Sequence, residues 1–263
     1  SFAHDEAAHE ARLKAFESQG PGRLVYDPDF HVPDYARREI HLQPGGYTDD
    51  PLGGIVYHYG TKIFYQGMND QDELHAEVAD FSAVPADGKV ANVLDIACGV
   101  GQGTVQLKRR FPGAEVWGLD VGLPVIRYAH MRSVELGSDV NYIQALAEET
   151  GFDDGQFDMV VSYIFFHEVP VEVMKAALKE VHRVLRPGGT FSIFEFPNHG
   201  ATPLPPAIRF MIDYDSRDNC EPYSPGFVYA DFRRLIAEAG FEVADGKQPS
   251  NAFLQSIVAT KPA

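Results

Sequence analysis

The chain has 263 residues, of which 44% are hydrophobic and 23% charged, a composition typical of a globular protein that buries a sizeable core. Asp and Glu number 38 against 22 Lys and Arg, so the formal charge is −16, which repels phosphate backbones and anionic lipid and disfavours a nucleic-acid partner. No apolar run approaches the roughly 20 residues of a membrane span, and the polar N-terminus lacks a secretory pattern, so we expect a cytoplasmic protein.

The first 88 residues differ in character from the rest of the chain. They combine an acidic amphipathic start with a loop-rich, aromatic middle, and Asn69 has the features of a helix N-cap followed by carboxylates in the first turn. We expect residues 1–88 to form a helical and loop cap.

From residue 89 onward, apolar β-rich runs alternate with helical patterns, which is typical of a parallel sheet with crossover helices. Strands are predicted at 89–97, 114–121, 140–145, 157–166 and 190–196, and helices at 104–111, 123–137, 171–185 and 231–240. Pro187 marks the end of the third of these helices, and residues 241–261 predict two closing strands that pair antiparallel. The predicted fold over 89–263 is α/β: a doubly wound, mostly parallel, seven-stranded Rossmann-like sheet with a reversed final strand.

The stretch from Pro197 to Gly226 is irregular and rich in proline. Loops of this length in a compact domain are usually functional or disordered. We therefore expect a substrate-cap insertion at about 197–228.

A glycine-rich loop, "CGVGQGT", follows the first predicted strand of the sheet. Glycines let the backbone approach a ligand closely, and the N-terminus of the next helix presents free N–H groups. A dinucleotide fingerprint starting at Gly99 requires glycine at position 104, where the chain has Thr104. The alternating Gly99, Gly101 and Gly103 behind Asp95 instead resemble motif I of the class I S-adenosylmethionine-dependent methyltransferases.

The resemblance extends in order and register over about residues 91–196. Asp120 ends the second strand, where the family places a carboxylate that takes the ribose hydroxyls, and two acceptor oxygens suit two vicinal O–H donors. The pair Ala147-Glu148 resembles the family's Ala-Glu pair beside the adenine, and "HRVLRPGGTFSIFEF" resembles its next helix, turn and strand.

The resemblance implies S-adenosylmethionine as cofactor and a set of residues that hold it. These are Tyr65, Asp95, Ala97, Gly99, Gly101, Gly103, Asp120, Val121, Ala147, Glu148 and Ser162. Two positions depart from the family pattern: Ala97 replaces its first glycine, and Leu146 replaces a common aspartate, which leaves Ala147 and Ser162 to supply polarity.

The methyl group of this cofactor is already activated, so the enzyme mainly aligns a nucleophile and excludes water, and a general base is optional. His167 and Glu168 follow the fourth strand at the edge where ligands bind, and His167 is our candidate base. The alternative for His167 is a helix cap or packing beneath the cofactor. Tyr59 and Asp213 are the other candidate substrate-side residues.

Four tyrosines, Tyr47, Tyr57, Tyr59 and Tyr65, lie close together in the cap segment. Aromatic faces attract cations, so a sulfonium or an amine would suit them, whereas the alternative is an aromatic core under the cap. We expect Tyr65 to cover the cofactor, as a tyrosine of the N-terminal lid commonly does in the resembled family.

The predicted function is methyl transfer from S-adenosylmethionine to an O, N or C nucleophile of a small molecule. Two alternatives stay open: a protein that binds the same cofactor without methyl transfer, and a nicotinamide-dependent oxidoreductase, against which Thr104 argues. Methyltransferases that modify the exocyclic amino groups of DNA bases resemble one another in an Asn/Asp-Pro-Pro-aromatic motif after the fourth strand. This chain has "SYIFF" there, so a flipped nucleic-acid base is disfavoured as substrate. We expect no metal ligands, because the histidines and the two cysteines lack metal-ligand spacing. We also expect no membrane partner, and a homodimer stays open.

Overall fold

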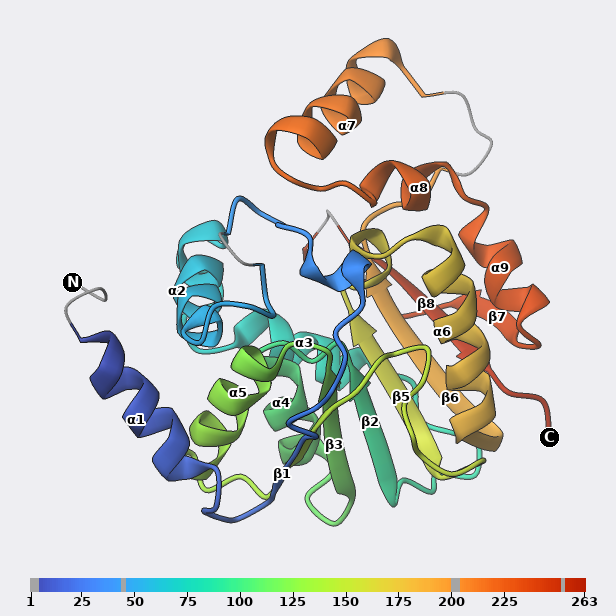
Figure 1. Cartoon of the computed structure of the whole chain (residues 1–263). Coiled ribbons are helices and arrows are strands. Elements are labelled where there is room, and N and C mark those ends of the chain that lie inside the picture. Colours follow the sequence, from blue (N-terminus) through green and yellow to red (C-terminus); the bar gives the residue numbers. More distant parts are fainter. Residues whose placement is uncertain (1–4, 44–45, 200–203, 252–253) are drawn as a thin grey trace.

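The computed structural model describes residues 5–43, 46–199, 204–251 and 254–263. Within these residues, eight strands form one sheet in the order β1-β4-β3-β2-β5-β6-β8-β7 (Figure 1). The strands are β1 (Leu24–Val25), β2 (Asn92–Ile96), β3 (Glu115–Asp120), β4 (Asn141–Gln144), β5 (Phe157–Tyr163), β6 (Leu185–Glu195), β7 (Glu242–Asp245) and β8 (Gln255–Thr260). β8 runs antiparallel to β6 and β7, and the other neighbours are parallel.

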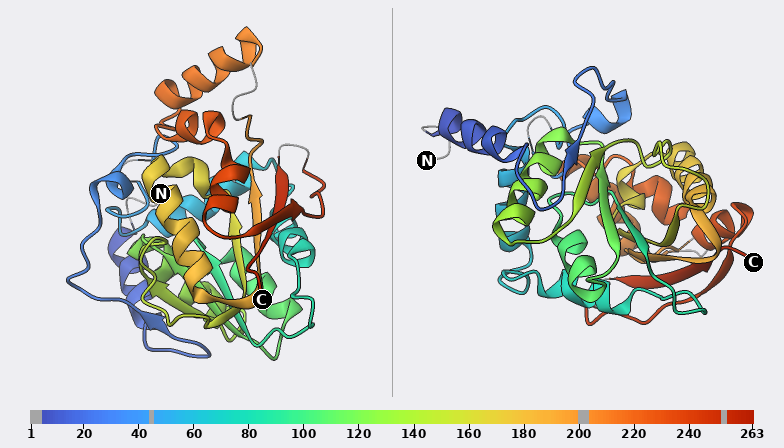
Figure 2. Two further views of the ribbon diagram at one scale, coloured as in Figure 1. Left: turned by 90° about the vertical axis from the view of Figure 1, so that its right-hand side faces the viewer. Right: turned by 90° about the horizontal axis from the view of Figure 1, so that it is seen from below.

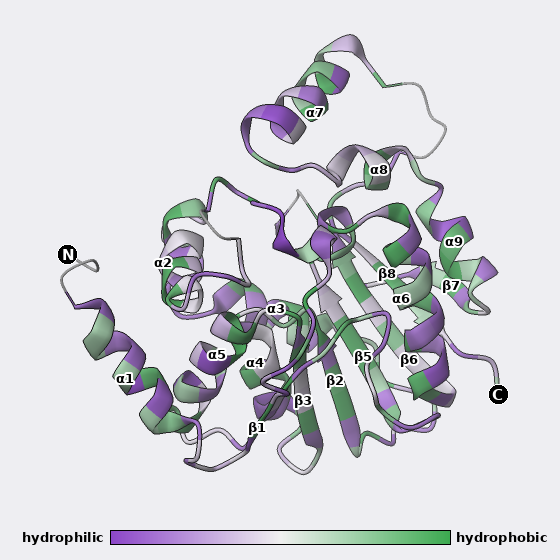
Figure 3. Ribbon diagram, viewed as in Figure 1, coloured by the Kyte–Doolittle hydropathy of each residue, from purple (hydrophilic) through white to green (hydrophobic). Residues whose placement is uncertain are grey.

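Helices cover both faces of the sheet (Figure 2). The α-helices are α1 (Glu6–Phe16), α2 (Gly53–Phe64), α3 (Glu73–Phe81), α4 (Gln102–Arg110), α5 (Leu123–Glu135), α6 (Val171–Val184), α7 (Pro206–Asp218), α8 (Ser224–Tyr229) and α9 (Phe232–Glu238). Leu178 of α6 and Ile236 of α9 join an apolar cluster on one face, while Leu107 of α4 and Ile126 of α5 are buried on the other. The strands between them are mostly hydrophobic (Figure 3), because parallel strands are buried on both sides.

The predicted doubly wound, mostly parallel sheet with a reversed final strand is confirmed. One strand was not predicted: β1, from the N-terminal segment, pairs in parallel with β4 through Leu24 and Val25. Two residues are too few to show an alternation of apolar and polar side chains, so the sequence gives no signal for this strand.

The predicted cap and insertion contain more helix than the sequence indicated. Within 1–88 lie α1, α2, α3 and a 3-10 turn, η2 (Asp34–Arg37), and within 197–228 lie α7 and α8. Pro205 and Pro206 begin α7, since proline is well tolerated in the first turn of a helix. Residues 1–4 and 44–45 of the predicted cap, 200–203 of the insertion and 252–253 of the closing segment lie outside the described residues.

The predicted N-cap at Asn69 is shifted. Asp72, with φ of 62°, is the residue at the N-cap of α3, whereas the side-chain oxygen of Asn69 accepts the N–H of Leu74 at 3.0 Å from five residues away. Asn69 therefore satisfies a free N–H of the first turn without occupying the cap position.

A second boundary differs at the end of α6. The helix ends at Val184, and β6 already begins at Leu185, so Pro187 and the following glycines lie inside the strand. Gly188 has φ of 74°, and the register between β5 and β6 shifts at this point, as expected of a strand irregularity that needs glycine.

The order of the strands defines where a ligand can bind. β2 lies between β3 and β5. From β2 the chain continues through β3 and β4 on one side and then crosses back to β5 and β6 on the other side, so the direction of winding reverses between β2 and β5. In open α/β sheets, ligands bind outside the carboxyl ends of the strands at such a switch point.

No helix in the described part of the chain is long and apolar enough to cross a membrane.

Gly101 closes the loop between β2 and α4, at the N-cap of the helix with φ of 72°. A Cβ atom there would lie 2.2 Å from the Tyr142 hydroxyl oxygen and 3.0 Å from the Ala129 Cβ. Both the backbone conformation and the space therefore require glycine.

We expect Gly101→Ala to destabilise the fold by roughly 2–4 kcal/mol, as the sum of a left-handed residue with a side chain and an overpacked contact. Gly113→Ala is the matched control, because no atom lies within 4 Å of its added Cβ. Urea unfolding of both variants checks this, and equal midpoints for the two would contradict it.

Candidate active site

A cavity of about 730 Å³ lies at the carboxyl edge of the sheet. Its floor comes from residues at or just after strand ends: Ala97 after β2, Asp120 of β3, Ala147 after β4, Tyr163 of β5 and Phe196 after β6. This volume is within the usual range of about 300–1,000 Å³ for small-molecule sites.

Two segments far apart in the sequence close the cavity from above. The N–H of His41 donates to the carbonyl of Cys220 at 3.4 Å, and the Tyr223 hydroxyl donates to the carbonyl of Tyr35 at 3.2 Å. His41 also forms an ion pair with Glu221. The N-terminal segment and the connection between α7 and α8 are thus joined across the roof.

Asp120 joins the glycine loop to the end of β3. Its two carboxylate oxygens accept the N–H groups of Gly99 and Gly122, each at 2.9 Å. Burial raises the pKa of Asp120, and these backbone hydrogen bonds oppose the rise. Each oxygen keeps a lone pair that can accept a further donor from the cavity.

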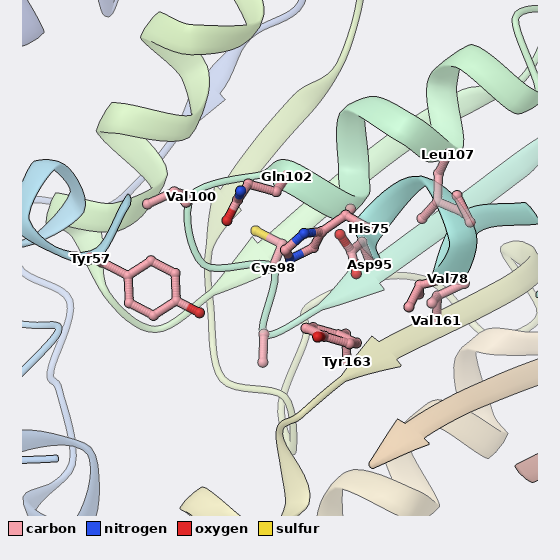
Figure 4. Close-up of a pocket in the computed structure, with 13 residues that line it drawn as sticks. Tyr57, His75, Val78, Asp95, Cys98, Val100, Gln102, Leu107, Val161 and Tyr163 are labelled. Carbon is pink, nitrogen blue, oxygen red and sulfur yellow. The ribbon is translucent and has the colours of Figure 1, made fainter. Parts of the chain in front are cut away.

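A smaller pocket of about 30 Å³ adjoins the large cavity and contains Asp95 and Gly103 (Figure 4). Its volume is sufficient for one or two water molecules at roughly 15 Å³ each. The Thr104 hydroxyl donates to Asp95 at 2.6 Å, and burial raises the pKa of Asp95 to about 7. In Figure 4 the side chains of Asp95, His75 and Tyr163 point toward one another.

The structure brings most of the predicted cofactor residues to these two spaces. Tyr65, Ala97, Gly99, Asp120, Val121, Ala147 and Glu148 line the large cavity, and Asp95, Ala97 and Gly103 line the small pocket. Gly101 and Ser162 line neither: Gly101 shapes the loop, and Ser162 is fully buried with no hydrogen-bond partner for its Oγ among the described residues.

Glu148 is held by the N-terminal segment, a contact that the sequence did not indicate. The hydroxyl of Tyr35 donates to its Oε1 at 2.5 Å, whereas its Oε2 is buried and has no hydrogen-bond partner among the described residues. Because an orphaned buried carboxylate oxygen is unfavourable, this atom marks a position where a ligand donor fits.

His167 lies in the 3-10 turn η3 (Phe166–Glu168), is 3% exposed and lines the cavity. Its Nδ1 donates to the Oε1 of Glu195 at 2.8 Å. Burial lowers the pKa of His167, but the charge and hydrogen bond of Glu195 outweigh it and, with Glu168 and Glu221, raise this pKa to about 9.

Glu168, His41 and Glu221 complete a polar cluster at this end of the cavity. The Oε1 of Glu168 lies 3.8 Å from the Nε2 of His41 and 4.0 Å from the Nε2 of His167. Burial raises the pKa of Glu168 to about 7 although the two histidines lower it. Sequence reasoning missed His41 and Glu221, since nothing in their spacing signals that the two segments meet.

Tyr59 and Asp213, the other two predicted substrate-side residues, line neither pocket. Tyr59 is 54% exposed because Tyr57, Gly60 and Phe64 form the face of α2 that borders the cavity. Asp213 is exposed on α7, where Asp215 and Asn219 border the cavity instead.

Three of the four clustered tyrosines do line the cavity. The rings of Tyr47 and Tyr57 meet edge to face at 5.3 Å, and the hydroxyls of Tyr65 and Tyr163 are 2.8 Å apart. Tyr65 is 8% exposed, so it forms part of the wall.

Comparison with known proteins decides the family. Residues 93–189 match the family model described as a methyltransferase domain. A protein of Synechocystis described as an uncharacterized methyltransferase is 31% identical over 206 residues, 78% of this chain and 90% of its own length. The chain belongs to the class I S-adenosylmethionine-dependent methyltransferases.

Two further methyltransferases show how far the likeness extends. The fatty-acid O-methyltransferase of Mycolicibacterium smegmatis is 32% identical over 72% of this chain, which spans 63% of that relative. Human N-acetylserotonin methyltransferase shares the fold, with a TM-score of 0.60 at 12% identity over 81% of this chain and 57% of its own.

The residues of this methyltransferase fit its cofactor. The Oε2 of Glu148 has no hydrogen-bond partner among the described residues, and both oxygens of Asp120 keep a free lone pair. Gly99 has no Cβ, so the space beside its backbone stays free where a Cβ would lie 3.5 Å from the Tyr57 ring. Among the described residues, no lysine or arginine lines the cavity, so its charge suits a sulfonium cation.

We expect Glu195→Gln to lower the pKa of His167 well below its value of about 9. The reason is that the variant removes the negative charge that stabilises the imidazolium, whereas burial, which favours the neutral ring, remains. Titration of the imidazole nitrogens by NMR checks this, with Glu238→Gln on the surface of α9 as control. A midpoint near 9 in Glu195→Gln would show that another group holds the proton.

Proposed function

We propose that this methyltransferase transfers a methyl group from S-adenosylmethionine to a small molecule with a large apolar part. The observation that supports it most is one cavity that extends from Asp120 and Glu148 to His167 and Glu168. Its remaining walls are largely apolar, with residues such as Ile40, Val56, Phe64, Phe165, Val169, Phe227 and Val228. The fatty-acid specificity named for the Mycolicibacterium relative agrees with an apolar substrate.

The apolar lining continues outside the mouth of the cavity. Phe64 of α2 borders the cavity and is 70% exposed. On α7, Ile208 and Met211 are exposed and lie on the same helix face as Asp215, which borders the cavity. We infer that the apolar part of the substrate extends toward α2 and α7.

We propose that the cofactor is held by the strand-end residues of the cavity and by the adjoining pocket. Asp120 and Glu148 would accept hydroxyl or amino donors of the nucleoside, and Tyr65, Ala97, Gly99, Val121 and Ala147 would surround it. Asp95 and Gly103 would act from the small pocket that they border, and Gly101 would act by shaping the loop. Ser162 of β5 lines neither space and would act only indirectly.

When bound, the sulfonium supplies an electrophilic methyl group. The residues of this chain then orient the acceptor and exclude water: the joined roof segments at His41 and Glu221 cover the cavity, and His167 is held in place by Glu195. Because burial in this cavity desolvates the acceptor, its nucleophilicity increases relative to water.

Different segments of the chain have different roles in the proposed function. We propose that residues 1–88 and about 197–228 form the substrate cap over a methyltransferase domain at 89–263, with a small molecule rather than nucleic acid as partner. The open cavity also supports catalysis over cofactor binding alone, since the tyrosines form its wall and leave its interior free. The homodimer and the cytoplasmic location stay predictions.

We expect Asp120→Ala to weaken S-adenosylmethionine binding roughly 10- to 100-fold, the loss of a charge-assisted hydrogen bond of about 1.5–3 kcal/mol. Isothermal titration calorimetry measures this, with Asp139→Ala in the exposed turn before β4 as the control that keeps wild-type affinity. Absence of binding to the wild type, or equal affinity of both variants, counts against the proposed function.

A further inference from the structure

Glu168 is the one carboxylate of the polar cluster that has no hydrogen bond among the described residues. Its side chain is 20% exposed toward the cavity, and its Oε1 is 3.8 Å from His41 and 4.0 Å from His167, beyond hydrogen-bonding distance. Both nitrogens of His41 are occupied, by Glu221 and by the Tyr47 hydroxyl. The Nε2 of His167 therefore faces Glu168 across a space that one bridging atom can fill.

Glu221 presents a second acceptor at the same end of the cavity. The residue is 4% exposed, its Oε1 pairs with His41, and its Oε2 is buried with no hydrogen-bond partner among the described residues. A buried carboxylate oxygen without a partner needs a donor, and the cavity is the space that it borders.

The charges at this end discriminate between acceptor groups. Glu168, Glu195 and Glu221 face two histidines, and no lysine or arginine lines the cavity within the described ranges. A carboxylate would add a fourth negative charge beside Glu168, Glu195 and Glu221, and the charge of protonated His167 is already paired with Glu195. A hydroxyl, in contrast, can accept from His167 and donate to Glu168.

We propose that the polar end binds the hydroxyl group of a neutral, largely apolar acceptor and that Glu168 is the general base that removes its proton. This inference rests on the proposed methyl transfer and specifies its acceptor. A lone pair of the hydroxyl oxygen forms the bond to the methyl carbon, the electron pair of the broken carbon–sulfur bond stays on sulfur, and the hydroxyl proton moves to Glu168.

His167 is then a positioning residue and not the base. With its pKa at about 9 and its Nδ1 bonded to Glu195, it carries a proton at neutral pH and can only donate. The pKa of Glu168, at about 7, is suited to accept a proton there. The titratable groups that face Glu168 are His41, His167, Glu195, Glu221, Tyr47, Tyr57 and Tyr65.

Calorimetry with three matched probes tests the acceptor class: 4-pentylphenol, 4-pentylbenzoate and 4-pentylbenzylamine, each titrated into protein saturated with S-adenosylhomocysteine. We expect the phenol to bind at least tenfold more tightly than the benzoate, and more tightly than the amine because an ammonium group cannot accept the Nε2–H of His167. Equal or tighter binding of the benzoate or the amine overturns the hydroxyl assignment, and so does the absence of binding by all three.

The pH dependence of the phenol affinity tests the role of Glu168. Since the ionised carboxylate is the acceptor, affinity rises with pH through 7, by roughly tenfold between pH 6 and pH 8. In Glu168→Gln this dependence disappears, and in the control Glu172→Gln, whose side chain is 81% exposed, it persists. A flat wild-type profile, or the same slope in Glu168→Gln, overturns the proposal.

Titration with S-adenosylhomocysteine separates the two levels of inference. Loss of its binding in the wild type defeats the proposed function, whereas normal binding without the phenol preference defeats only the hydroxyl acceptor and the base assigned to it. The same titration shows that Glu168→Gln is folded.

Discussion

The carboxylate of Asp120 is the contact on which the rest of the site depends. It accepts the N–H groups of Gly99 and Gly122, and so it fixes the glycine loop after β2 against the end of β3. These two donors lie on one side of the Asp120 carboxylate, and its other side lines the cavity. A single strand-end acid therefore sets the loop geometry and keeps lone pairs directed to a ligand, which explains why an acidic residue is required where β3 ends.

The second constraint is the roof, which the sheet does not determine. The N-terminal segment and the connection between α7 and α8 join through the His41 and Glu221 ion pair and the contact of Tyr223 with Tyr35. The same two segments bring His41 and Glu221 to the acceptor end, beside His167 and Glu168 of η3 and Glu195 of β6. Substrate specificity can then change through these segments while the cofactor residues on strand ends stay in place.

The parts that the sequence predicted are those with local, periodic or motif-like signals. The apolar runs of β2 and β5 and the strand-end position of Asp120 needed only neighbouring residues for their prediction. The two-residue β1 and the meeting of His41 with Glu221 depend on tertiary contacts. The helix α7 has no buried residue, and the prolines that begin it indicated an irregular stretch instead. The sequence identified His167 and Glu168 together as site residues. The protonation of His167 depends on Glu195 of β6, and no local signal indicates that this strand brings Glu195 to His167.

The charge of the cavity is consistent with the proposed proton transfer. Before transfer, the cavity would hold a positive sulfonium and an ionised Glu168; afterwards it would hold a neutral thioether and a protonated Glu168. The total charge inside the protein is therefore unchanged, and no unpaired charge is created in a buried space, where it would be strongly unfavourable. A carboxylate acceptor would lose its own negative charge together with that of the sulfonium, so the total charge would again be unchanged, with Glu168 ionised throughout. The difference lies in the complex before transfer, where a carboxylate would stand beside the like charges of Glu168, Glu195 and Glu221 and a neutral hydroxyl would not.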